Sequence, residues 1–214
     1  MSLPAELPLF PLNVVLFPGM LLPLHIFEPR YRRMLNLCVE EEIPFGLVLA
    51  TNDELPHRVG VAAHIQQIER LTDGRSNIIT LGQERFRVTD FRHDFPYPVA
   101  SVEEWPCPAQ RGPHLAAYTA AARQAFGDYL DALRGAIGQD ISVDEMPDEP
   151  DTLAYLIAVV LQVSLEQKQA LLEAPILIDL LRWEQRLMHS ETAILRYMER
   201  TRPLADDAGP ISPN

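Results

Sequence analysis

The stretch from Leu7 to Phe27 constrains the fold most, because it carries no charged side chain yet contains several prolines. A membrane-spanning helix needs about 20 uncharged residues, so length alone would permit one here. Pro8, Pro11 and Pro18 would break that helix into one or two turns, since proline has no amide hydrogen to continue it. Lipid cannot satisfy the backbone groups that such breaks would free. The stretch therefore predicts short buried strands joined by proline-containing corners, and no membrane contact.

Hydrophobic spacing divides the chain into a strand-rich half and a helical half. In the first half it predicts an amphipathic helix starting at Pro29 and a hairpin with Asp73-Gly74 in its turn, a pair that favours the positive φ of a tight turn. In the strand after that turn, Arg85 and Arg87 alternate with apolar residues, which predicts that both arginines face water. From Pro113 the apolar period becomes 3.6, as in helices packed against one another.

The helical half carries two further patterns. Leu180, Leu187 and Ile194 recur every seven residues, which predicts a long helix packed inside a bundle and leaves a coiled-coil homodimer as the alternative. Ser164 and Gln167 have the spacing of a capping box at the start of another helix. The expected domains are residues 1–108, rich in strands, and residues 109–202, all helical, with a flexible tail at residues 203–214.

Three motifs in the strand-rich half recur in a known family. They are LPLFPLNVVLFPG at Leu7–Gly19, PLHIFEPRYR at Pro23–Arg32 and GQERFRV at Gly82–Val88. In this order they resemble the N-terminal substrate-binding domain of the ATP-dependent Lon proteases, and weaker similarity continues to the helical segment Lys168–Glu173. The resemblance implies an α+β fold, in which a PUA-like pseudo-β-barrel is followed by an α-helical bundle and engages protein substrates. It also implies a stand-alone form that lacks the ATPase and protease modules.

The net charge of −12 is spread along the chain. Nine arginines stand against fourteen acidic residues in residues 1–108, and nine basic residues against fourteen acidic ones in residues 109–202. An RNA-binding PUA-like barrel would need clustered Lys or Arg for its phosphate contacts. The densest basic group, at residues 30–33, follows Glu28, which is spaced to pair with Arg32 on one helical face. Nucleic acid is therefore not an expected partner, and RNA binding stays an alternative.

No catalytic, metal or cofactor site is predicted. Lys168, the only lysine, follows Gln167 rather than a glycine, which excludes a phosphate-binding Walker A loop. Ser164 and Lys168 have the spacing of a serine-lysine dyad on one helical turn, but the capping box explains the serine better. The six histidines form no HExxH motif, and the two cysteines are too few for a disulfide framework. A hydrolase with an unrecognised site is the remaining enzymatic alternative.

Non-catalytic recognition of polypeptide is the expected function. The corner around Pro18-Gly19 carries Phe, Met and Leu side chains that cannot easily all point inward, and an exposed apolar patch is typical of a protein-binding surface. The alternative is that the corner buries these side chains and only caps the barrel. The expected ligands are unfolded proteins or segments of a partner protein. The first residues show no secretory signal, so a cytoplasmic location is expected. The expected contact residues are Leu16, Phe17, Met20, Leu21, Phe27 and Tyr31.

Overall fold

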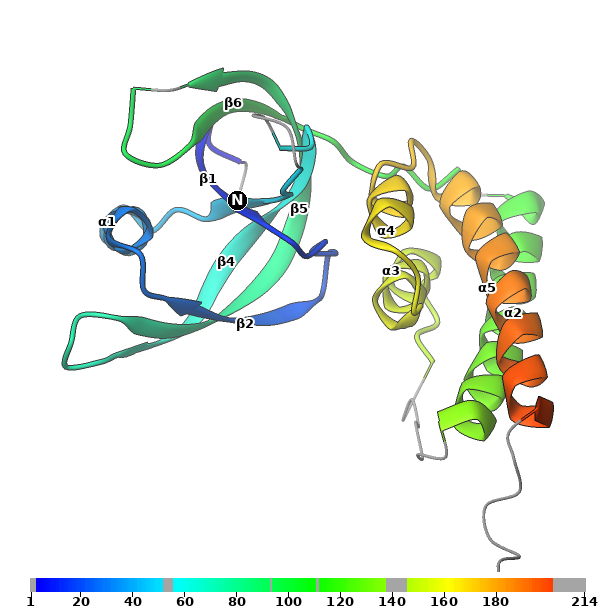
Figure 1. Ribbon diagram of the computed structural model, residues 1–214. Coiled ribbons are helices and arrows are strands. Elements are labelled where there is room, and N and C mark those ends of the chain that lie inside the picture. The colour runs from blue at the N-terminus through cyan, green and yellow to red at the C-terminus, as the bar shows by residue number, and fades with distance from the viewer. Residues whose placement is uncertain (1–2, 52–55, 93, 111, 138–145, 202–214) are drawn as a thin grey trace, which may run out of the picture.

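A computed structural model describes residues 3–51, 56–92, 94–110, 112–137 and 146–201. In these ranges the chain forms a strand lobe and a helical lobe, joined by the segment that follows residue 104 (Figure 1). The strands are β1 (Glu6–Leu12), β2 (Leu21–Ile26), β3 (Phe45–Leu49), β4 (Val59–Arg70), β5 (Ser76–Arg92) and β6 (Val99–Glu104). The helices are α1 (Pro29–Glu40), α2 (Pro113–Ile137), α3 (Pro150–Val160), α4 (Leu165–Leu172) and α5 (Leu177–Thr201).

The strand lobe is a pseudo-barrel. Its strand order is β2-β5-β4-β3-β1-β6, and the long strand β5 also pairs with β6, which brings the sheet round on itself. Strands β1 and β3 run parallel, whereas the other pairs are antiparallel. Strand β2 pairs with the first part of β5 alone, so the barrel is not closed along its whole length. The predicted α+β class, with a pseudo-barrel ahead of helices, is confirmed.

Local signals account for several element boundaries of the strand lobe. Gly74 has φ +82° in the turn between β4 and β5, as the Asp73-Gly74 pair predicted. Helix α1 starts at Pro29, where proline's missing amide hydrogen costs nothing. Glu28 is the extended residue before that helix, and its carboxylate pairs with Arg30 at 2.9 Å. The predicted pairing of Glu28 with Arg32 is therefore wrong, because Glu28 lies just outside the helix and not on its surface.

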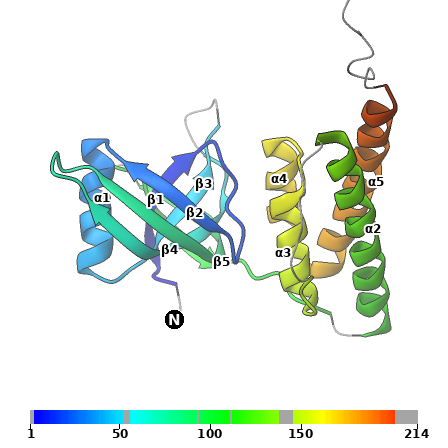
Figure 2. The ribbon, with the colours of Figure 1, turned by 90° about the horizontal axis from the view of Figure 1, so that it is seen from below.

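The helical lobe turns its two short helices toward the strands. Figure 2 shows α3 and α4 between the strand lobe and the long pair α2 and α5. The capping box at the start of α4 is confirmed: the Gln167 amide donates to Ser164 Oγ at 3.2 Å, and the Ser164 amide donates to Gln167 Oε1 at 3.0 Å. Lys168 Nζ instead donates to the Val159 carbonyl at the end of α3, at 2.9 Å. The Ser164 hydroxyl therefore acts as a helix cap.

Helix α5 packs its apolar seam inside the lobe. Leu180, Leu181 and Met188 are fully buried, whereas Ile194, near the end of the helix, is 49% exposed. The first two heptad positions, Leu180 and the half-buried Leu187, therefore pack within this chain. The coiled-coil homodimer remains an untested alternative. Among the residues that the structure describes, no helix combines the length and apolar character that a membrane span requires. The predicted tail, residues 203–214, lies outside the described residues.

Candidate functional site

The loop between β1 and β2 is held against β5 by backbone contacts at Gly82. The Gly19 amide donates to the Gly82 carbonyl at 2.8 Å, and the Gly82 amide donates to the Met20 carbonyl at 2.9 Å. A Cβ atom at position 82 would lie only 2.4 Å from the Phe17 carbonyl oxygen, so this close approach requires glycine. The contact fixes which side chains of the loop turn into the barrel and which turn out.

Three of the six predicted contact residues belong to the core. Leu16 and Phe17 are 1% and 0% exposed, and Tyr31 is 6% exposed with its ring 4.2 Å from that of Phe10. Their burial does not support a role in direct ligand contact, because the barrel takes up these side chains. The groove described below therefore does not include them.

The other three predicted contact residues reach the surface at two places. Met20 is half-buried and Leu21 is 60% exposed, and both lie where the β1–β2 loop enters β2. Phe27 is 58% exposed but lies beyond the far end of β2, where its ring stacks on that of His25 at 6.0 Å. Only Met20 and Leu21 therefore share one surface.

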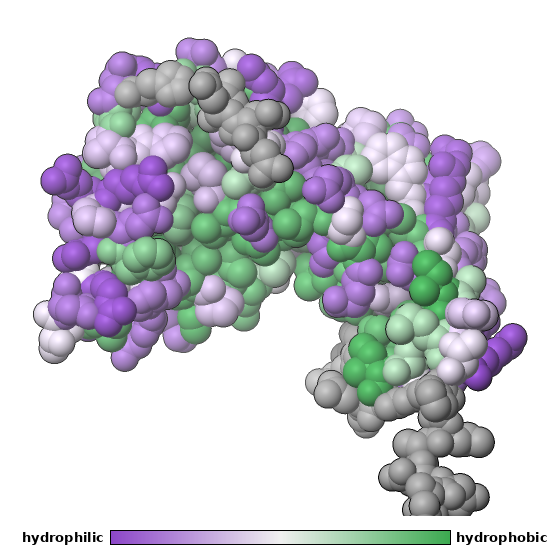
Figure 3. Space-filling model, viewed as in Figure 1, coloured by the Kyte–Doolittle hydropathy of each residue, from purple (hydrophilic) through white to green (hydrophobic). Residues whose placement is uncertain are grey.

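That surface forms one wall of a groove between the lobes. The groove has a volume of about 390 Å³. The strand lobe supplies the segment from Pro18 to Leu21, and the helical lobe supplies Pro147, Thr152, Tyr155, Leu156 and Val159. Figure 3 shows hydrophobic residues gathered on this side of the molecule, where the two lobes meet above a notch in the outline. We call this feature the interlobe groove. Its helical wall was missed from the sequence, because Tyr155, Leu156 and Val159 read as ordinary helix residues.

Polar contacts hold the helical wall in place. Arg123 on α2 donates to the Met146 carbonyl at 3.3 Å and to the Pro147 carbonyl at 2.6 Å, which fixes the segment leading into α3. The hydrogen bond from Lys168 to the Val159 carbonyl fixes the other end of α3, and burial lowers the pKa of the Lys168 amine. Burial also raises the pKa of the Tyr155 phenol, which keeps it neutral and suited to an apolar wall.

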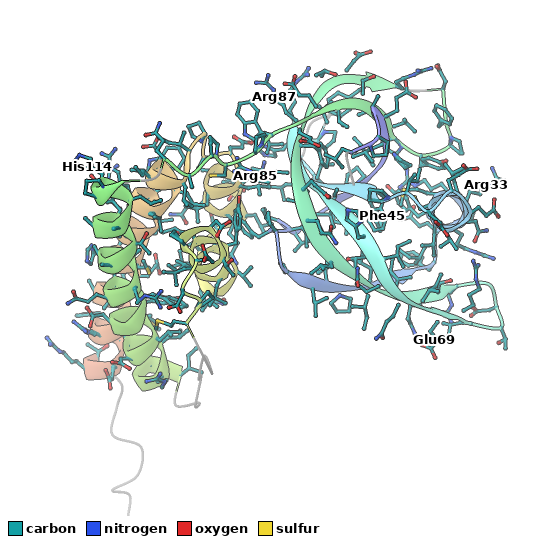
Figure 4. The ribbon with its side chains drawn as sticks, turned by 180° about the vertical axis from the view of Figure 1, so that it is seen from behind. Arg33, Phe45, Glu69, Arg85, Arg87 and His114 are labelled. Atoms are coloured by element: carbon teal, nitrogen blue, oxygen red, sulfur yellow. The ribbon has the colours of Figure 1, made fainter. Side chains whose placement is uncertain are left out.

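Arg85 joins the two lobes beside the groove. Its guanidinium donates to four backbone carbonyls at 2.5 to 3.1 Å, those of Trp105, Pro106, Leu172 and Ala174. The first two belong to the segment after β6, and the other two lie at the end of α4. Figure 4 shows Arg85 where the strand lobe meets the helices. The prediction that Arg85 faces water is therefore wrong, because α4 covers this part of β5 and leaves the side chain 4% exposed.

Further hydrogen bonds reinforce this junction. Gln169 on α4 donates to the Val59 carbonyl on β4 at 3.0 Å and to Glu173 at 2.8 Å. The Leu177 amide, at the start of α5, donates to the Pro108 carbonyl at 3.2 Å. The relative position of the two groove walls is thus set by directional bonds as well as by apolar packing.

The charged residues at the rim of the groove are mainly acidic, and one of them, Asp148, forms an ion pair with Arg123 at 3.9 Å. Asp148, Glu149 and Asp151 are exposed beside Pro147 and Thr152, which line it. Among the described residues, no group of three or more His, Cys, Asp and Glu side chains is placed to hold a metal ion. The thiol of Cys38 lies away from the groove in the strand lobe, and burial raises its pKa to about 12, which makes it an unreactive structural cysteine.

Two other hollows have similar volumes but lie within the strand lobe. One, of about 400 Å³, lies between the end of α1 and β4 and is lined by Glu42, His64 and three glutamines among other residues. The other, of about 430 Å³, lies on the outer face of β2, β5 and β4 and mixes apolar residues with Glu69 and Asn77. The interlobe groove differs from both in taking its walls from both lobes, and its lining is more apolar than that of either.

Solved structures show the class of fold to which this architecture belongs. A Lon N-terminal domain protein from Xanthomonas campestris matches with a TM-score of 0.62 and 25% identity, covering 83% of this chain and 95% of that one. The N-terminal domain of a Mycobacterium avium complex Lon protease matches with a TM-score of 0.69 and 19% identity, covering 86% and 98%. The family profile described as the ATP-dependent protease La (LON) substrate-binding domain matches residues 6–190. The chain therefore belongs to the Lon substrate-binding domain family.

Curated relatives are much longer than this chain. Lon protease 1 of Hydrogenovibrio crunogenus is 27% identical over 197 residues, which cover 88% of this chain and 24% of the relative. The Lon protease of Paraburkholderia phytofirmans is 31% identical over 169 residues, which cover 75% and 21%. The chain thus spans about a quarter of these relatives or less, and the region it matches is the substrate-binding domain.

Proposed function

We propose that this chain binds exposed hydrophobic segments of unfolded or partner proteins in the interlobe groove, without catalysing a reaction on them. The observation that carries the proposal is the groove itself, with apolar side chains from both lobes and a volume of about 390 Å³. Pockets of roughly 300 to 1,000 Å³ with apolar walls are typical of binding sites. Membership of a substrate-binding family supports a polypeptide as the occupant.

The expected affinity is micromolar. Each apolar side chain that the groove buries contributes about 1 to 2 kcal/mol, and ordering of the bound segment offsets part of that gain. The part of the binding that comes from apolar contact should change little with salt, and a few charged contacts at the rim add only a modest salt dependence. An RNA ligand would instead weaken steeply as salt rises, because counterion release dominates its affinity. The described residues add no observation that favours RNA binding or a hydrolase site.

Charged substitutions in the groove test the proposal. Leu21→Asp and Leu156→Asp should each weaken the binding of β-casein, an unfolded protein, about tenfold or more, since each places a carboxylate among apolar groups. Fluorescence anisotropy with labelled β-casein measures the affinity. Ile194→Asp is the matched control, because it places the same charge on an exposed apolar residue of α5.

The same samples separate the alternatives. Each variant is first compared with the wild type by circular dichroism, so that unfolding is not mistaken for lost binding. The wild type should neither hydrolyse ATP nor cleave the casein. If both groove variants bind casein as tightly as the Ile194→Asp control, the groove is not the site. Casein cleavage by the pure protein would favour the hydrolase alternative.

A further inference from the structure

One edge of β2 has none of the described strands beside it. Among the described strands, β2 pairs only with β5, in an antiparallel register that places Leu22 opposite Thr80 and Leu24 opposite Ile78. The hydrogen bond from the Gly82 amide to the Met20 carbonyl belongs to the same register. Hydrogen-bonded pairs alternate along an antiparallel ladder, so the even-numbered residues of β2 direct their amide and carbonyl groups toward β5.

The odd-numbered residues of β2 direct their backbone groups the other way. These residues are Leu21, Pro23 and His25, and their side chains are all exposed. Among the described residues, the amide and carbonyl groups of Leu21 and His25 make no backbone hydrogen bond outside the β2–β5 ladder. Because all three residues are exposed, this edge of β2 is open to solvent or to another backbone. Pro23, which has no amide hydrogen, occupies a position where proline leaves the β5 ladder intact.

The free edge of β2 runs into the interlobe groove. Leu21 belongs to both, because it is the first residue of β2 and one of the groove-lining residues. A backbone lying along the edge from His25 to Leu21 would continue toward α3. An unpaired strand edge can form hydrogen bonds with another extended backbone. Every second side chain of that backbone would contact the apolar groove. The acidic rim favours basic residues at the remaining positions.

We propose that β2 binds its polypeptide ligand by strand addition, with an extended segment pairing along the Leu21–His25 edge and its apolar side chains entering the interlobe groove. This inference rests on the proposed function, and it specifies the ligand as an extended segment in which apolar and basic residues alternate. An amphipathic helix could not form hydrogen bonds with the unpaired backbone groups of β2, because its own backbone groups are already paired within the helix.

Two substitutions at one position test the strand addition. His25→Ala and His25→Pro remove the same side chain, but only the proline removes the edge amide. Proline should be tolerated, since Pro23 already occupies an equivalent position in the same strand. The probe is a nine-residue peptide that alternates valine and lysine, acetylated and amidated at its ends. We expect His25→Pro to bind it about fivefold more weakly than His25→Ala, the effect of one lost hydrogen bond.

A gain of affinity provides a second test. Pro23→Ala adds an amide donor to the free edge, and we expect the peptide to bind this variant more tightly than the wild type. Hydrogen exchange followed by NMR should also show the Leu21 and His25 amides protected when the peptide is bound. A peptide with N-methyl groups on alternate residues keeps its charge and side chains but cannot form the full set of backbone hydrogen bonds. It should bind much more weakly and should no longer protect the Leu21 and His25 amides of the protein.

The outcomes distinguish this inference from the function on which it rests. If β-casein and the peptide bind but His25→Pro equals His25→Ala and neither edge amide is protected, strand addition is overturned while groove binding stands. If neither probe binds the folded wild type, the proposed function fails and the inference with it. A second copy of this chain could instead pair with β2. Analytical ultracentrifugation would then show a dimer, and both edge amides would be protected before any peptide is added. That result would also overturn the inference.

Discussion

Replacing Arg85 by methionine should lower the free energy of unfolding by about 3 kcal/mol or more. Arg85 is 4% exposed, and its guanidinium donates to four carbonyls on both sides of the lobe junction. Methionine fills much of the same volume but donates no hydrogen bond, so buried acceptors are left unpaired. Urea denaturation followed by circular dichroism measures the loss. Because Arg85 holds the groove walls together, Arg85→Met should also weaken casein binding.

Arg87 supplies the matched control two residues along β5. It is exposed, pairs with Glu103 at 2.8 Å and stacks over the Trp105 ring at 4.4 Å. Arg87→Met removes the same charge from a surface site, where such pairs contribute at most about 1 kcal/mol. Equal stability of the two variants would contradict a junction built on Arg85.

The stability that protonated Glu184 contributes should fall as pH rises above about 4.5, the ordinary pKa of a glutamate carboxyl group. This side chain on α5 is fully buried, and neither carboxylate oxygen has a hydrogen-bond partner among the described residues. Burial raises the pKa of Glu184 well above its ordinary value. Above the ordinary pKa the unfolded state releases this proton, whereas the folded state keeps it. The contribution of Glu184 to stability is therefore greatest at pH values below the ordinary pKa.

Comparison with Glu184→Gln isolates this effect, because glutamine carries no titrating proton. Over the range in which only the folded state holds the proton, the stability of the wild type relative to Glu184→Gln should fall by about 1.4 kcal/mol per pH unit. Urea denaturation from pH 5 to pH 7 measures the difference. The exposed Glu199 on the same helix is the control, and Glu199→Gln should follow the wild type. A constant difference between wild type and Glu184→Gln would show that Glu184 is not held protonated.

Local features of the chain were predictable because their causes lie within a few residues. Pro29 starts a helix, the Asp73-Gly74 pair makes a tight turn, and the Ser164 hydroxyl caps α4, each through contacts with near neighbours in sequence. The three family motifs predicted the order of strand lobe and helical lobe, which the fold confirms. The division into domains 1–108 and 109–202 stays a prediction, since nothing here tests whether either lobe folds alone.

Long-range contacts decide the site, and they escaped the sequence patterns. The alternation around Arg85 predicts on which face of β5 the side chain lies. It does not predict that α4, some ninety residues later in the chain, covers that face. Burial of Leu16 and Phe17 depends on the contact of the β1–β2 loop with Gly82, which apolar content alone could not predict. The free edge of β2 did leave a signal, because Pro23 within an apolar run is typical of an edge strand.

Photo-crosslinking from inside the interlobe groove tests most directly whether polypeptide binds there. Thr152 lines the groove and is exposed, so a p-benzoylphenylalanine placed at position 152 should capture β-casein on irradiation. The same group at position 124, replacing an exposed glutamine on α2, should capture little. Excess valine-lysine peptide should suppress the crosslink at position 152. Equal capture from both positions, or capture from position 124 alone, would contradict the groove as the binding site.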